Sequence, residues 1–169
     1  MTTRFLLTGW LLLAASLPTA LAQQTPATPP TEEAPRVSQA DALEAWDRFR
    51  QAPEQHLDLA TTFLRFMQGG SVHTVLRSDV LFWMYAPYPP DVQAVLYAAY
   101  MGGNLDSQLR GKRQGDDPEA GIAAALDAWA GVKKTHPTLD IPRLDELAKA
   151  RREGRLAAAL DGGTAPAQP

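Results

Sequence analysis

The chain has 169 residues, of which 16 are lysine or arginine and 19 are aspartate or glutamate, so its formal net charge at pH 7 is −3. This mildly acidic balance differs from the strongly basic one of most nucleic-acid-binding domains, and no nucleic acid is predicted as a partner. The absence of cysteine excludes a disulfide framework, a thiolate metal site and a lipid anchor attached to cysteine.

The first 22 residues predict a cleaved secretory signal peptide. Arg4 precedes an apolar run at residues 5–17, and an A-x-A sequence follows at residues 20–22. The apolar run is shorter than the roughly 20 residues that a membrane-spanning helix needs, so no stable membrane span is predicted after cleavage. A retained membrane anchor is the alternative. We therefore expect an exported protein, periplasmic or secreted, whose mature chain begins near Gln23.

Low-complexity sequence flanks the region that is able to fold. Residues 23–36 are rich in proline, threonine and alanine, which predicts a disordered linker. Residues 161–169 have a similar composition and predict a disordered tail. The folded part is expected between residues 37 and 160, a length that suits one domain.

In this region the apolar side chains recur at helical spacing, and no run shows the alternation typical of strands. We therefore expect a single all-α domain of about six helices, packed as a bundle or as stacked helical hairpins. Capping and proline signals place the first two helices at about residues 38–52 and 54–68. The last two are expected at residues 117–136 and 142–160, with Gly154 as a weak point in the final helix.

The densest run of large apolar side chains lies between two Gly-Gly pairs, at residues 69–70 and 102–103. We interpret this run as two central helices, residues 71–85 and 90–101, joined by a stiff elbow at residues 85–91. Proline fixes φ and lacks a donor, so the prolines of the elbow should end the first of these helices and begin the second.

One short sequence occurs twice. Residues 42–46 (ALEAW) recur as residues 125–129 (ALDAW), and a turn containing proline follows each copy. Duplicated helical hairpins produce such pairs. Ala125, Trp129, Val132 and Pro137 also resemble the second-helix spacing of a tetratricopeptide repeat, A-x3-F-x2-A-x4-P. The resemblance covers about thirteen residues, and the first-helix pattern of that repeat is absent, so it assigns no family.

Asp79 is the one ionisable residue singled out as a weak catalytic candidate. On a helical repeat it shares a stripe with the apolar residues of the third expected helix, which predicts partial burial. A buried carboxylate could act as a general acid or hold a ligand. The alternative is a structural ion pair or hydrogen bond with Arg77, Arg65 or a helix-end amide.

Metal and cofactor chemistry find no support in the sequence. The three histidines, His56, His73 and His136, are isolated from one another, and no pair has the spacing of a zinc site. No serine lies in a G-x-S-x-G elbow. We therefore predict no metal site and no cofactor.

Two groups of residues are candidates for binding. Trp83, Tyr85 and Tyr88 lie at or beside the proline elbow, where tyrosine offers an apolar face with a polar tip to a peptide or a sugar. A basic loop is expected at residues 110–115, and it could hold an anionic group. Its basic residues are Arg110, Lys112 and Arg113.

These observations predict an exported helical interaction module of the cell envelope or the extracellular space. Its expected partner is another envelope or extracellular protein, and a glycan is also compatible with the aromatic elbow. Two alternatives are left open: an enzyme acting on an envelope polymer, with Asp79 as acid, and a purely structural envelope component. The lack of a dense catalytic constellation favours binding or structure over catalysis.

Overall fold

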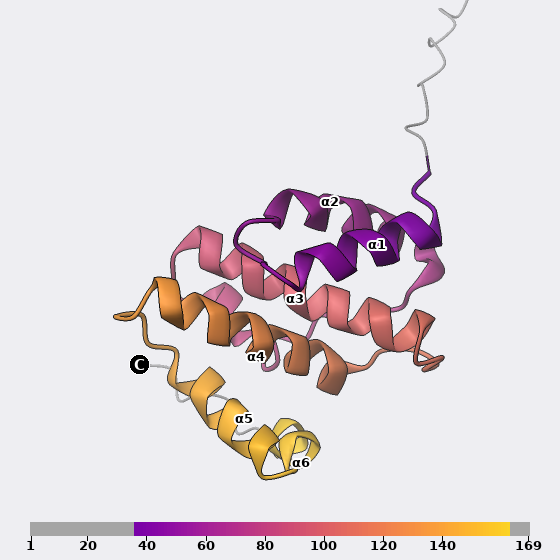
Figure 1. Ribbon diagram of the computed structural model, residues 1–169. Coiled ribbons are helices and arrows are strands. Elements are labelled where there is room, and N and C mark those ends of the chain that lie inside the picture. Colours follow the sequence, from indigo (N-terminus) through magenta and orange to yellow (C-terminus); the bar gives the residue numbers. More distant parts are fainter. Residues whose placement is uncertain (1–35, 163–169) are drawn as a thin grey trace, which may run out of the picture. The chain divides into compact units, whose positions relative to one another are not determined.

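The computed structural model describes residues 36–162, which form six α-helices and no β-strand (Figure 1). The prediction of an all-α domain with about six helices is confirmed for this part of the chain, and none of its helices has the length and apolar character needed to cross a membrane. The predicted signal peptide, the linker up to residue 35 and the tail from residue 163 lie outside the described residues. The helices are α1 (Gln39–Phe49), α2 (Leu57–Phe66), α3 (Pro90–Leu109), α4 (Pro118–Thr135), α5 (Pro142–Arg152) and α6 (Leu156–Asp161).

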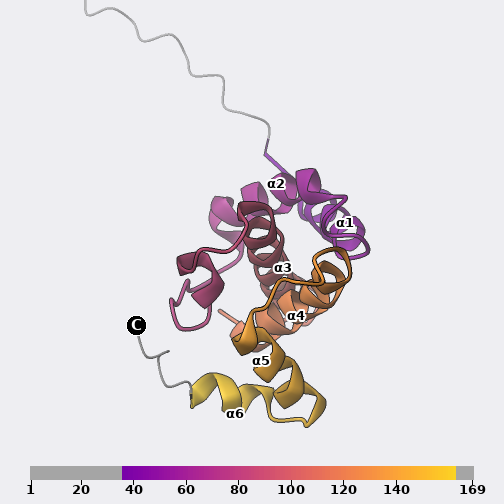
Figure 2. The same cartoon turned by 90° about the vertical axis from the view of Figure 1, so that its left-hand side faces the viewer.

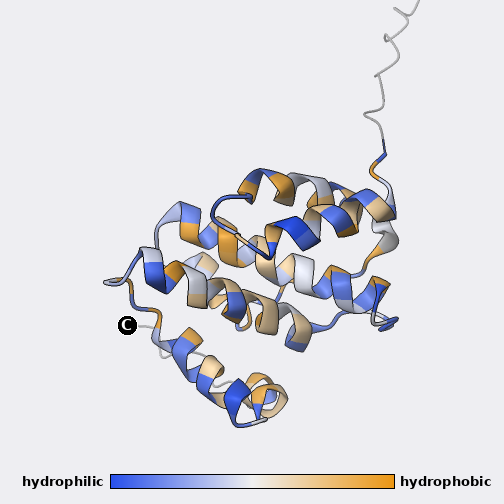
Figure 3. Ribbon diagram, viewed as in Figure 1, coloured by the Kyte–Doolittle hydropathy of each residue, from blue (hydrophilic) through white to orange (hydrophobic). Residues whose placement is uncertain are grey.

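Helix α3 lies in the middle of the helical domain. It packs along α4 on one side and against α1 and α2 on the other, while α5 and α6 pack beyond α4 (Figures 1 and 2). The helices carry both apolar and polar positions (Figure 3), and most of α3 from Val92 to Leu105 is buried. Helix α3 therefore contributes more buried residues to the core than any other helix in residues 36–162.

The expected helix starts at Ser38 and Asp117 are both present. The Ser38 hydroxyl accepts from the Asp41 amide and the Asp41 carboxylate accepts from the Ser38 amide, which forms a capping box before α1. The Asp117 carboxylate accepts from the Ala120 amide, and Pro118 occupies the first position of α4. Short-range capping chemistry therefore fixed the beginnings of these two helices.

Helix α3 does not end at Met101 as expected, but runs through the second Gly-Gly pair to Leu109. A Cβ atom at position 102 would lie 2.1 Å from the Trp46 ring, and one at position 103 would lie 2.5 Å from the carbonyl oxygen of Ala120. The two glycines therefore let α1 and α4 approach α3 closely, a packing role that outweighs their weak helix propensity.

The third expected helix, residues 71–85, is wrong. A π-helical turn, η1 (Met67–Ser71), is followed by residues 73–77 without regular secondary structure, a turn at residues 78–80 and a 3-10 helix, η2 (Phe82–Tyr85). Gly70 adopts φ +80° in η1, a conformation that ends helical geometry and that glycine adopts readily. Several β-branched valines in this stretch also favour extended backbone.

The last expected helix is divided in two. Gly154, the predicted weak point, adopts φ +68° between α5 and α6. The number of helices therefore agrees with the prediction because one expected helix is absent and another is split.

Candidate functional site

Residues 72–89, which we call the strap, connect η1 to α3 and are fastened to α3 by two glutamine side chains. The Gln108 carbonyl accepts from the His73 amide at 3.0 Å, and its Nε2 donates to the His73 carbonyl at 2.7 Å. At the other end, Gln93 Nε2 donates to the carbonyls of Trp83 and Ala86 at 2.9 and 2.8 Å. These bonds satisfy backbone groups that a helix would have paired internally.

The strap carries all the large apolar side chains that are exposed in residues 36–162. The exposed fractions are 44% for Val75, 56% for Leu76, 38% for Met84 and 73% for Tyr85. An exposed group of this kind, concentrated in one segment, is typical of an interaction site. Sequence analysis missed Val75, Leu76 and Met84 because helical spacing assigned the apolar residues of this stretch to the core.

A groove of about 250 Å³ adjoins the strap. It lies among the end of α2, the first part of the strap and the middle of α3. Its lining is mainly apolar: Leu64, Met67, Gln68, Val72, Thr74, Leu76, Tyr97 and Met101. Leu76 belongs both to this groove and to the exposed group, so the groove adjoins that group at Leu76.

The three aromatic candidates have different surroundings. Tyr85 is exposed, Tyr88 is half-buried against the core, and Trp83 is completely buried beside Phe82. Trp83 therefore does not offer its ring to a partner, which corrects its expected place on a binding surface. Tyr85 remains on the surface as a binding candidate.

Asp79 is exposed and not partly buried, because the helix that defined its apolar stripe is absent. Its Oδ2 lies 2.5 Å from Arg77 Nη2, and its Oδ1 accepts from Arg77 Nε at 3.2 Å. The hydrogen bonds from Arg77 hold the pKa of the Asp79 carboxyl below its ordinary value. A lowered pKa keeps the group ionised at neutral pH, which is the opposite of what a general acid requires.

Replacing Asp79 with asparagine should therefore change stability only slightly. The pair is exposed, so we expect the free energy of unfolding at pH 7 to fall by less than about 1 kcal/mol. Because the folded-state pKa is lowered, this contribution is present above the ordinary pKa of 3.8 and is lost as the pH falls through the folded-state value. A double-mutant cycle with Arg77→Gln, followed by urea unfolding, measures it; coupling well above 1 kcal/mol would contradict the exposed geometry.

In the basic loop, Arg110 is engaged with two carboxylates. Its guanidinium donates to Asp47 of α1 at 2.9 and 2.5 Å and to Asp106 of α3 at 2.7 Å. It therefore links the end of α3 to α1. Lys112 and Arg113 are exposed, and Lys112 adopts φ +55°. All three basic residues are thus exposed, but the guanidinium of Arg110 is engaged in contacts within the protein.

A buried polar network joins α3 to the loop before α4, and sequence analysis did not find it. Asn104 is fully buried; its Nδ2 donates to Asp116 Oδ1 at 2.8 Å, and its Oδ1 accepts from the Asp117 amide at 3.2 Å. The same Oδ1 accepts from Gln108 Nε2 at 2.6 Å. Since Gln108 also holds His73, the network orients one of the two fastenings of the strap.

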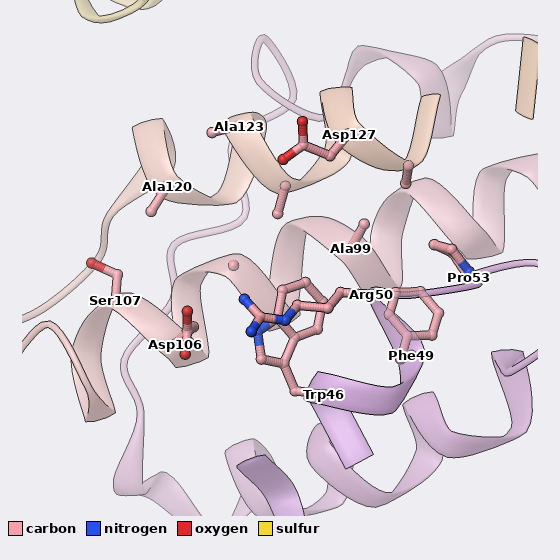
Figure 4. Close-up of a pocket in the computed structure, with 13 residues that line it drawn as sticks. Trp46, Phe49, Arg50, Pro53, Ala99, Asp106, Ser107, Ala120, Ala123 and Asp127 are labelled. Atoms are coloured by element: carbon pink, nitrogen blue, oxygen red, sulfur yellow. The ribbon is translucent and has the colours of Figure 1, made fainter. Parts of the chain in front are cut away.

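A second concave feature is a cleft of about 340 Å³ between α1 and α4 (Figure 4). Trp46 and Arg50 lie on the α1 wall, while Ala120, Ala123 and Asp127 lie on the opposite wall, which α4 forms. Residues of α3, among them Ala99 and Gly103, line it between these walls. The cleft and the groove beside the strap share no lining residue.

No group of three or more histidine, aspartate or glutamate side chains within residues 36–162 is placed to hold a metal ion. His136 instead lies 3.3 Å from the Glu54 carboxylate, and the His73 backbone pairs with Gln108.

A scan against protein-family models found no matching family, and searches of the curated proteins and of the solved structures found no match to this chain. The function is therefore inferred from the geometry of the site.

Proposed function

We propose that this protein is an exported interaction module that binds a partner protein through the strap and its groove. The observation that supports this most directly is the concentration of exposed Val75, Leu76, Met84 and Tyr85 in one segment. Exposing large apolar side chains to water is unfavourable unless a partner covers them. The signal-like sequence of residues 1–22 supports a location outside the cytoplasm.

The fastening of the strap supports a binding role as well. Gln93 and Gln108 fix the backbone on both sides of the exposed residues. A surface that is already ordered loses less conformational entropy on binding, which improves affinity. The strap therefore resembles a preformed docking surface more than a loose connection.

The chemistry of the surface selects the kind of partner. The groove is lined mainly by aliphatic and aromatic side chains, and the neighbouring charges of Arg77 and Asp79 neutralise each other. We therefore propose a protein partner that inserts one or two apolar side chains into the groove and covers Leu76 and Tyr85. Enzyme function with Asp79 as acid has less support, because Asp79 is exposed and its pKa is lowered.

The combined replacement Leu76→Ser and Tyr85→Ser should weaken partner binding at least about tenfold, since buried anchors at interfaces contribute about 1 to 2 kcal/mol or more. Partners are first retained from envelope extract on the immobilised chain, and affinity is then measured with the purified partner. Because both residues are exposed, the unfolding midpoint should change little.

The matched control is Ala130→Ser, at an exposed position of α4 next to α5. It should bind as the unmodified chain does. Equal affinity of the double variant and this control would contradict the proposal. Sedimentation of the purified chain tests a second copy as the occupant: a dimer that the double variant abolishes would replace the partner protein in this account.

A further inference from the structure

We infer that the cleft between α1 and α4 binds a small organic carboxylate of about dipeptide size. Its volume, about 340 Å³, falls within the range of small-molecule sites in proteins. The space exists because the α3 and α4 sides are lined largely by glycine and alanine: Ala99, Gly103, Ala120, Ala123, Ala124 and Ala128. This lining suits a ligand with a compact apolar body.

An unpartnered donor lies in the α1 wall. Trp46 is 3% exposed and lines the cleft, but its indole Nε1 has no hydrogen-bond partner within residues 36–162. Trp129, which follows the same A-L-x-A sequence in α4, donates its Nε1 to Asp145 at 3.0 Å. A buried N–H without an acceptor is costly, so an acceptor supplied by a ligand would be stabilising at Trp46 and not at Trp129.

The charges around the cleft favour an anionic acceptor. Asp106 is paired with Arg110 at 2.7 Å and Asp127 with Arg151 at 2.6 Å, so each carboxylate of the cleft has a guanidinium. Arg50 lies 3.1 Å from Asp47, but both oxygens of Asp47 already accept from Arg110. Arg50, the arginine that lines the cleft, thus shares its partner Asp47 with Arg110. A guanidinium binds a carboxylate well, so Arg50 is placed to bind a second one.

The number of negative charges on the ligand also affects how well it binds. Asp106 and Asp127 both line the cleft, and their negative charges oppose a dianion such as phosphate more than a carboxylate with one charge. Water does not reach the Trp46 nitrogen in this structure, so contact requires a side chain of that wall to move. The Arg50 side chain is 52% exposed and has room to do so.

The test is an NMR titration of the full chain carrying ¹⁵N-labelled tryptophan. The two probes are acetyl-Ala-Ala with a free carboxylate and the same peptide with a carboxamide end, each at about 10 mM, which detects dissociation constants near 1 mM. We expect the carboxylate probe to move the indole signal of Trp46 but not that of Trp129, and the amide probe to move neither. Equal responses to the two probes, or no response to either, would overturn the inference.

Two variants test the named donors. Trp46→Phe, followed through backbone amide signals, and Arg50→Gln should each weaken binding of the carboxylate probe about fivefold or more, as expected for one lost hydrogen bond. Trp129→Phe is the matched control and should leave the affinity unchanged. An unshifted Trp129 indole signal shows that the Trp46 and Arg50 variants remain folded. If Trp46→Phe unfolds the chain, Arg50→Gln and the comparison of the two probes still decide the question.

Discussion

The replacement Gly103→Ala is expected to lower the free energy of unfolding by about 2 kcal/mol, the usual scale of an overpacked core. The added Cβ would lie 2.5 Å from the Ala120 carbonyl oxygen and 2.7 Å from the Ala124 Cβ. Both atoms belong to α4, whose contact with α3 is the most extensive between helices in residues 36–162. Because one of them is a backbone oxygen of a helix, relief requires α3 and α4 to move apart.

Gly131→Ala in α4 is the matched control. No atom of residues 36–162 lies within 4 Å of a Cβ built at that position, so alanine there gains helix propensity without a clash. We expect it to raise the free energy of unfolding by about 0.5 to 1 kcal/mol. Urea unfolding of both variants measures the contrast, and equal effects of the two replacements would show that α3 and α4 are not packed as closely as described.

The replacement Asn104→Ala should lower the free energy of unfolding by about 3 kcal/mol, because it leaves partly buried polar groups without their partner. The Asn104 side chain bonds to Asp116, to the Asp117 amide and to Gln108, and it is completely buried. Gln108 would then lose the contact that orients it toward His73. The backbone amide of His73 should exchange its hydrogen faster.

Urea unfolding and native-state hydrogen exchange measure these two effects. Gln114→Ala, at an exposed position in the loop before α4, is the control and should change stability by less than about 0.5 kcal/mol. A loss below about 1 kcal/mol for Asn104→Ala would contradict a network held together by this side chain. Unchanged exchange at His73 would separate the network from the strap.

Local capping chemistry was the part of the fold that sequence predicted well. The starts at Ser38 and Asp117 depend on side chains within three residues of the amide they cap, and the break at Gly154 depends on one residue's backbone freedom. Such features need no knowledge of distant neighbours. They are therefore readable from a single sequence.

Features that depend on distant residues were not predictable in the same way. The strap has the apolar spacing of a helix, but its backbone is held by Gln93 and Gln108 from α3. Gly102 and Gly103 looked like a helix end because their neighbours across the core, Trp46 and Ala120, are not visible in local sequence. Tertiary contacts override local propensity at both places.

The candidate site shows the same limit. Trp83 and Tyr85 are two residues apart, yet one is completely buried and the other is 73% exposed. The repeated A-L-x-A-W sequence contains two tryptophans, but only the structure shows that both are buried, that Asp145 satisfies Trp129 and that no residue within 36–162 satisfies Trp46. Residue type suggested candidates, while burial and partners distinguished them.

The most direct test of the proposed binding surface is photocrosslinking from single positions of the strap. A photoreactive amino acid is placed at position 76, at position 85 or, as control, at position 130 of α4, and the chain is irradiated with its purified partner. We expect crosslinks from positions 76 and 85 to one apolar region of the same partner and none from position 130. Crosslinks from position 130 alone, or none from the strap, would contradict it.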